Sequence, residues 1–208
     1  MGRYCGAKCK LCRRSGEKLF LKGERCFTAK CALERRAYGP GQHGKARKSN
    51  SGYAIRLREK QKVKRSYGLL EKGFKKYYHM ATAVKGVTGS QMLVHLETRI
   101  DNIVYKLGFA SSRAQARQLV SHGRVMLNGK KVYRPGIEVK PGESVEVVEK
   151  LKKNINVVAA MDAAIARNVP EWLELNKNEA KGTIKALPTR EQISSSINEQ
   201  LIVELYSK

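Results

Sequence analysis

Acidic residues are scarce in this sequence, and the shortage is concentrated in its first half. Residues 1–100 contain 25 lysines and arginines against 6 acidic residues, whereas residues 101–208 contain 17 against 12. The 208 residues together carry a formal charge of +24. A net charge of this size is informative about binding partners and solubility but does not indicate which fold the chain adopts. A basic first half with so few carboxylates predicts a polyanionic partner, of which nucleic acid is the most abundant.

Long apolar runs are also missing. No stretch approaches the roughly 18 apolar residues that span a bilayer, and no apolar segment of a secretory signal follows Met1. Cysteine is absent from residue 32 onward. Without export, we expect the reducing cytoplasm, where clustered cysteines more often bind metal than form disulfides.

Signatures of catalysis are lacking as well. The sequence has no G-x-x-x-x-G-K-[ST] loop, no G-x-G-x-x-G that follows a strand and no H-E-x-x-H. No His-x-Glu is accompanied by the cysteine pair of a zinc deaminase. Asp162 and Glu171 occupy ordinary helical or loop positions. We therefore expect that the protein is not an enzyme.

The five cysteines gather within the first 31 residues, and four of them have the spacing C-x2-C-x13-C-x4-C. These four are Cys9, Cys12, Cys26 and Cys31. Two close pairs joined by a loop let four thiolates converge on one tetrahedral Zn²⁺. Cys5 offers alternative spacing to Cys9, but the two-residue gap of the favoured set is the tightest. The alternative interpretation is a cluster of reduced cysteines that bind no metal.

A shell of four thiolates has no open position for water or substrate, so the expected cofactor is one structural Zn²⁺. Residues 1–45 are rich in glycine and too poor in apolar residues to form a core of their own. A segment of this kind needs a metal to hold a structure. We expect a zinc-stapled basic arm over residues 1–45.

Helical periodicity is predicted from Tyr53 to about Val87, from Met92 to Leu107, from Arg113 to His122 and over residues 155–167. Asn128-Gly129, between two apolar stretches, predicts a type I′ hairpin, and Ser144–Val148 predicts a further strand. Pro170–Leu175 and Leu201–Tyr206 have an extended pattern. Helices together with a small antiparallel sheet predict an α+β fold.

Four groups of residues are the predicted nucleic-acid contacts. The arm contributes Arg3, Lys8, Lys10, Arg13 and Arg14, and the glycine-rich loop after it contributes His43, Lys45, Arg47 and Lys48. The predicted helix that follows contributes Arg56, Arg58, Lys60, Lys62, Lys64 and Arg65. The helix that starts at Arg113 contributes Arg113, Arg117, His122 and Arg124.

Each group also has a plainer interpretation. Glu59 is the only acid between Arg56 and Arg65, and like charges one helical turn apart repel unless an anion neutralises them. Phosphate contact is therefore favoured over a merely solvated helix face. His43 is as well explained as a turn residue. Tyr53 and Tyr67 are candidates for stacking on bases or sugars, or for the core.

The stretch Asp101–Ala110, followed by Ser112-Arg113, Arg117–Gly123 and the Asn128-Gly129 turn, resembles the S4 RNA-binding module. Pro40–Gly44, Leu57–Lys62 and Asn198–Lys208 resemble bacterial small-subunit ribosomal protein four. The resemblance runs essentially from end to end. Three positions depart from the family pattern: Cys5 replaces an apolar residue, Gly136-Ile137 replaces Ser-Tyr, and Arg124 replaces a histidine.

This resemblance implies a primary binder of small-subunit rRNA that clasps a multi-helix junction in the 5′ domain and nucleates assembly of the body. It also implies small-subunit protein five as a neighbour near the path by which mRNA enters, with a role in translational accuracy. Some family members carry a zinc-binding arm. The implied organisation is an arm at 1–45, a helical domain at 46–95 completed by the tail at about 177–208, and the module at 96–176.

Two other classes of protein carry related features. A ribosome-associated or regulatory RNA-binding factor could use the same module, and co-sedimentation at one copy per small subunit separates it from a structural protein. An RNA-modifying enzyme needs a catalytic domain of about a hundred residues beyond the module, for which this chain has no room.

Overall fold

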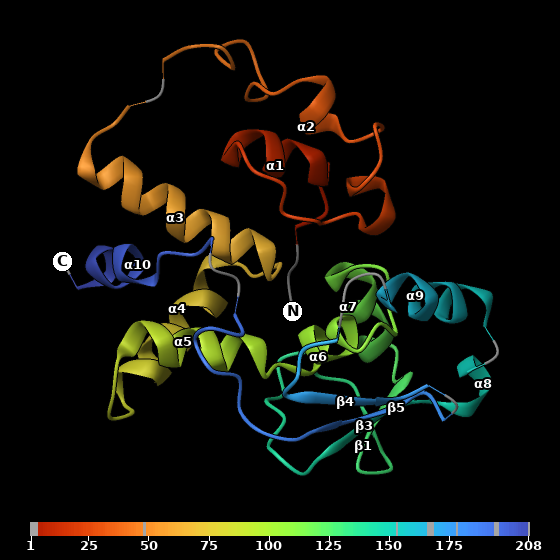
Figure 1. The fold of residues 1–208 in the computed structure, drawn as a ribbon. Coiled ribbons are helices and arrows are strands. Elements are labelled where there is room, and N and C mark those ends of the chain that lie inside the picture. Colours follow the sequence, from red (N-terminus) through yellow and green to blue (C-terminus); the bar gives the residue numbers. More distant parts are fainter. Residues whose placement is uncertain are drawn as a thin grey trace. The chain divides into compact units, whose positions relative to one another are not determined.

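The computed structural model describes residues 4–47, 49–152, 154–165, 169–177, 179–193 and 196–207. The chain divides into two compact units (Figure 1). The first contains Met1–Leu93 and Ser194–Lys208, and the second contains Val94–Ile193. In sequence, the second unit is thus an insertion between two parts of the first. No helix in the described part of the chain is long and apolar enough to cross a membrane.

The first unit is helical. Its elements are α1 (Lys8–Ser15), the 3₁₀ turn η1 (Gly23–Cys26), α2 (Ala32–Arg35), α3 (Gly52–Ser66), α4 (Glu71–Thr82), the start of α5 (Thr88–Glu97) and α10 (Glu199–Tyr206). Ser51 caps α3, where its side chain accepts a hydrogen bond from the Ala54 amide. The segment predicted as a loop-rich arm therefore contains short helices.

Helix α10 packs beside α3 in the first unit (Figure 1). Its Ile202 is fully buried, and the ring of Tyr206 lies 4.8 Å from that of Tyr78 on α4. The extended pattern predicted for Leu201–Tyr206 is therefore wrong. Its apolar and β-branched residues have strand propensity, but packing of one helical face against α3 and α4 decides the conformation.

The second unit combines helices with a five-stranded antiparallel sheet. Its elements are α6 (Ile100–Lys106), α7 (Arg113–Ser121), β1 (Val125–Leu127), β2 (Lys130–Val132), β3 (Ser144–Val147), α8 (Glu149–Lys152), α9 (Ile155–Ile165), β4 (Leu173–Asn176) and β5 (Lys181–Ile184). The strand order is β2-β1-β3-β5-β4. The α+β class and the small antiparallel sheet are thus confirmed.

The predicted hairpin is confirmed. Leu127 pairs with Lys130 across a two-residue turn, and the φ angles of Asn128 and Gly129 are 49° and 77°. Two positive φ angles are the requirement of a type I′ turn.

Helices α6 and α7 lie against the sheet (Figure 1), and a shared core joins them. Ile103 of α6, Leu107 directly after it, Val120 of α7 and Val145 of β3 are all fully buried there. Gly182 of β5 lets α6 approach closely, because a Cβ at this position would lie 2.5 Å from both methyl groups of Leu107.

The single helix predicted from Met92 to Leu107 is wrong, because α5 ends at Glu97 and α6 begins at Ile100. Arg99 between them has an extended backbone and forms an isolated bridge with Glu138. The Ile100 amide donates to the Ile137 carbonyl at 2.8 Å. These contacts with a distant segment break a periodicity that looks continuous in the sequence.

The division of the chain also differs from the predicted organisation. Residues 1–45 belong to the same unit as α3 and α4, and the chain returns to that unit at residue 194. The tail was expected from about residue 177, but β5 at Lys181–Ile184 pairs with β3 and β4 inside the second unit.

Candidate nucleic-acid interface

The four predicted zinc ligands line one small cavity in the arm, with a volume of about 20 Å³. Cys9 and Cys12 lie three residues apart on α1, hence on one face of the helix, and Cys26 and Cys31 are buried. Burial raises the pKa of the Cys12 thiol above its ordinary value; a backbone hydrogen bond from Leu19 opposes this, and the neighbouring Cys26, Cys9 and Cys31 raise it further.

The four cysteines line one cavity, but this alone does not give their sulfur atoms the geometry of zinc ligands. Among the described residues, no group of three or more His, Cys, Asp or Glu side chains is placed so that it could hold a metal ion. The Zn²⁺ therefore stays a prediction. Cys5 is exposed and lies outside the lining of the cavity.

Arg13 of the arm organises the glycine-rich loop. Its Nε donates to the Tyr38 carbonyl at 3.0 Å and its Nη2 to the Gly39 carbonyl at 3.3 Å. The loop closes where the Gly39 amide donates to the Gly44 carbonyl. A Cβ on Gly44 would lie 2.0 Å from the Gly39 carbonyl oxygen, so glycine is required there.

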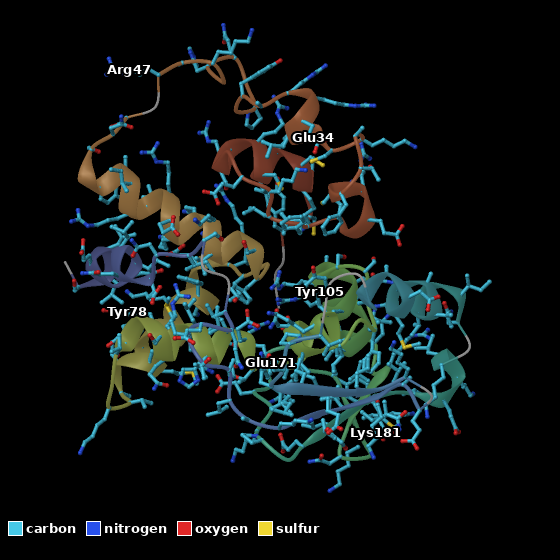
Figure 2. All side chains as sticks on the ribbon, viewed as in Figure 1. Glu34, Arg47, Tyr78, Tyr105, Glu171 and Lys181 are labelled. Atoms are coloured by element: carbon cyan, nitrogen blue, oxygen red, sulfur yellow. The ribbon has the colours of Figure 1, made fainter. Side chains whose placement is uncertain are left out.

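The remaining predicted contacts of the arm and loop are mostly solvent-facing. Lys10, Arg14, His43, Lys45 and Arg47 are exposed, and Arg47 lies on the segment between α2 and α3 (Figure 2). Lys8 is half-buried, with its Nζ donating to the Tyr4 carbonyl at 2.8 Å. Arg3 and Lys48 lie outside the described residues.

Helix α3 differs from its prediction, because its cations have partners inside the protein. Arg56 Nε donates to Glu204 Oε2 of α10 at 2.7 Å, and Lys62 Nζ donates to the Ser196 carbonyl at 2.6 Å. Lys62 also lies 2.9 Å from Glu59.

The other four cations of α3 are paired in the same way. Lys60 and Lys64 both bind Glu71, Arg58 Nη2 donates to the Ser49 carbonyl at 2.9 Å, and Arg65 Nη1 donates to Ser15 Oγ at 3.3 Å. Glu204, Glu71 and Glu59 thus supply carboxylates to four of these six cations, which reduces the like-charge repulsion predicted along the helix. The phosphate contacts of these residues stay a prediction.

Glu71 is the centre of a polar cluster that joins α3, α4 and α10. Its carboxylate accepts from Lys60, Lys64 and the Tyr206 hydroxyl, each at 2.7 Å. Partial burial raises the pKa of Glu71, but these three hydrogen bonds outweigh it and lower the pKa to about 2. Burial and the Glu71 charge together raise the pKa of Tyr206 well above its ordinary value.

Two arginines of the first unit lie close together. Burial lowers the pKa of Arg65, and the neighbouring Arg14 charge lowers it further. Arg14 is exposed at the end of α1, so this pair places two positive charges near Ser15.

In the second unit, the arginines of α7 stand on a buried polar cluster at the start of α6. Arg113 Nε donates to Asn102 Oδ1 at 2.7 Å, and its guanidinium lies 4.8 Å from the ring centroid of Tyr105. Arg117 Nη1 lies 3.7 Å from Asp101 Oδ2. The hydrogen bond and the ring contact orient Arg113, while Arg117 lies within ion-pair distance of Asp101.

The buried partners of this cluster were missed by the sequence reasoning. Glu97, Arg99, Asp101 and Asn102 are all at most 4% exposed. Arg99 forms two hydrogen bonds with Asp101, while Asn102 Nδ2 donates to Glu97. The available signal was a run of polar residues between apolar segments. His122 and Arg124 are exposed just beyond α7.

A second omission concerns α4, whose Lys72, Lys75 and Lys76 are exposed. These lysines alternate with apolar residues, so they formed no basic run in the sequence. Tyr67 is buried and belongs to the core, whereas Tyr53 is 65% exposed.

Comparison with known proteins covers the whole chain. The family described as "Ribosomal protein S4/S9 N-terminal domain" matches residues 3–97, and the family described as "S4 domain" matches residues 98–145. Small ribosomal subunit protein uS4 of Geotalea daltonii is 57% identical over 208 residues, and that of Maridesulfovibrio salexigens is 58% identical. Protein uS4A of Myxococcus xanthus is 53% identical. In each case, all of both chains is covered.

Proposed function

Because this chain belongs to the family of small ribosomal subunit protein uS4, we propose that it is a structural constituent of the small ribosomal subunit that binds the subunit's rRNA. The observation that carries the proposal is the 57% identity with a uS4 protein over the full length of both chains. The proposed location is the cytoplasmic ribosome, and the proposed role is binding and assembly rather than catalysis.

The fixed and the exposed cations have different tasks in this mechanism. A-form RNA hides its bases in a deep groove, so proteins recognise its shape, its phosphates and its 2′-hydroxyls. Arg113, whose Nε is oriented by Asn102, meets this need because little side-chain freedom remains to be lost on binding, and Arg117 adds a second guanidinium on the same helix face. Lys10, Arg14, Lys45, Arg47 and Arg124 are exposed and supply further positive charge toward the solvent.

We propose that the RNA target is the multi-helix junction in the 5′ domain of small-subunit rRNA and that binding there nucleates assembly of the body. The same family resemblance supports small-subunit protein five as a neighbour near the path of incoming mRNA, with a role in translational accuracy. Crosslinking of assembled subunits through an engineered cysteine tests that neighbour, and loss of every crosslink to protein five would refute it.

One structural Zn²⁺ held by Cys9, Cys12, Cys26 and Cys31 is the proposed cofactor. Support comes from the four thiol groups around one cavity and from their Lewis softness, which suits zinc. Bound zinc would fold the arm without opening a reactive position. Metal analysis of purified protein should find about one Zn²⁺ per chain, and Cys26→Ser should lose it and become protease-sensitive within residues 4–47. Unchanged metal content or unchanged protease resistance would refute the proposal.

The central experiment compares two RNAs of equal length, the 5′-domain junction and an unrelated structured RNA, across a salt titration. A preference of about 10³-fold or more for the junction at physiological salt is expected for a specific complex. Curves that coincide and fall together as salt rises would mean that net charge alone binds RNA, and would overturn the proposed target. Co-sedimentation at one copy per subunit distinguishes a constituent from a transient factor.

A further inference from the structure

One face of α4 carries positive charge that the proposed contacts do not use. Its side chains lie at positions i, i+3, i+4 and i+7, so they share one side of the helix. They are Lys72, Lys75, Lys76 and His79. All four are exposed, and with Met80 and Ala83 they line an open, shallow surface along the helix.

The opposite face of α4 is part of the core. Phe74, Tyr77, Tyr78 and Ala81 are buried there, and Phe74 and Tyr78 pack near Tyr206 of α10. The lysine face is therefore fixed in orientation by a packed helix and does not depend on a mobile loop.

No carboxylate neutralises this face. Within the described part of the chain, none of the three lysines, nor His79, forms a side-chain hydrogen bond or an ion pair. Glu71 is the one acid of α4, and both of its oxygens are occupied by Lys60, Lys64 and Tyr206. Lysines one turn apart therefore repel each other, and a bound anion would remove that repulsion.

Helices α3 and α4 differ in how many of their cations are available to an external anion. Each of the six cations of α3 has an internal partner, and Lys60 and Lys62 are 8% exposed. Contact of α3 with phosphate would have to compete with these bonds. Contact of α4 displaces only water, so α4 is the better surface for an external polyanion.

Gly73 is a second, independent observation on the same helix. Glycine in a helix interior costs stability relative to alanine, yet a Cβ at this position would meet no atom within 4 Å. Packing inside the protein does not require the glycine. Its bare backbone beside Lys72 and one turn from Lys76 allows a phosphodiester chain to approach the helix closely.

We propose that the α4 face formed by Lys72, Lys75, Lys76 and His79 binds the phosphate backbone of structured RNA as a separate contact surface. Each lysine acts as a point charge on a phosphate. The inference rests on the proposed function and adds to it a surface outside the sites predicted from the sequence. The partner is RNA rather than an acidic protein because the face offers almost only cations and few apolar contacts.

The test replaces Lys72, Lys75 and Lys76 by glutamine in the full-length protein and measures binding to the 5′-domain transcript at several KCl concentrations. Loss of three phosphate contacts should reduce the slope of log K against log salt by about three units. A triple arginine variant should keep the slope of the wild type. The matched control is Lys140→Gln, Lys150→Gln and Lys177→Gln, which removes equal charge from exposed lysines of the second unit, each near an acid in the sequence.

The outcomes separate this inference from the proposed function. If the wild type shows no preference for the 5′-domain transcript, the proposed function fails. If it does, and the glutamine variant keeps the slope of the wild type or loses no more than the control, the α4 face is not a phosphate surface. Normal RNA binding with reduced co-sedimentation on assembled subunits would assign the face to a protein partner and overturn the inference. Circular dichroism confirms that each variant is folded.

Discussion

Glu71→Gln should loosen the C-terminal helix α10 from α3 and α4. The carboxylate accepts hydrogen bonds from Lys60, Lys64 and Tyr206, and its pKa falls from 4.5 to about 2 on folding. At 1.36 kcal/mol per pH unit, that depression corresponds to roughly 3 kcal/mol. The Glu71 side chain is 46% exposed, so solvent screening reduces the effect. We expect the free energy of unfolding to fall by about 1–2 kcal/mol at pH 7.

The pH dependence follows from the sign of the pKa change. A carboxyl group whose pKa is depressed by folding contributes its full stability above its unfolded pKa, here near 4.5. The contribution disappears as the pH falls through the folded pKa of about 2. The difference between wild type and Glu71→Gln should therefore be constant above about pH 5 and shrink toward zero near pH 2.

Urea unfolding followed by circular dichroism at 222 nm measures this difference. Trp172 is the only tryptophan and lies in the second unit, so its emission follows that unit separately. Glu174→Gln is the matched control, because Glu174 is 60% exposed and lies 3.7 Å from Lys185; we expect a change below about 0.5 kcal/mol. A loss at pH 7 no larger than that of the control, or a loss that persists at low pH, would refute the reasoning.

Three further substitutions are expected to have defined effects. Arg113→Ala should weaken RNA binding and reduce its salt slope by about one unit, measured by filter binding; an unchanged slope would remove Arg113 from the phosphate contacts. Gly73→Ala should stabilise α4 by about 0.5–1 kcal/mol in urea unfolding, and a destabilised variant would contradict the open space at that position. Gly182→Ala should cost about 1–3 kcal/mol, because its Cβ would overlap the buried Leu107; Trp172 emission reports this loss, and wild-type stability would show that α6 can shift.

Sequence patterns predicted the secondary structure correctly where neighbouring residues alone determine it. Asn128-Gly129 specifies its hairpin through its own backbone preferences, and the core of α7 follows from periodicity. The break at Arg99 was not predictable in this way, since it depends on pairing with Glu138. The helical state of Leu201–Tyr206 depends on packing against α3 and α4 and was likewise missed.

The candidate site shows the same division. The basic character of α3 was visible in the sequence, but its acidic partner Glu204 lies 148 residues from Arg56. The number of basic residues in the sequence of α3 therefore overstated how many cations are available to bind a ligand. On α4 the reverse holds, because Lys72, Lys75 and Lys76 are interrupted by core residues and formed no conspicuous run, although the fold leaves them without acidic partners in the described part of the chain.

The insertion of one unit within the other has a consequence for the order of events during synthesis. Helix α3 is made long before its partners on the C-terminal segment, since Lys62 binds Ser196 134 residues later. At typical translation rates of about 5–20 residues per second, the wait lasts roughly 7–30 s. The second unit, continuous from Val94 to Ile193, is synthesised within that interval. Until the C-terminal segment has been synthesised, Arg56 and Lys62 of α3 lack the partners that Glu204 and Ser196 supply in the finished protein.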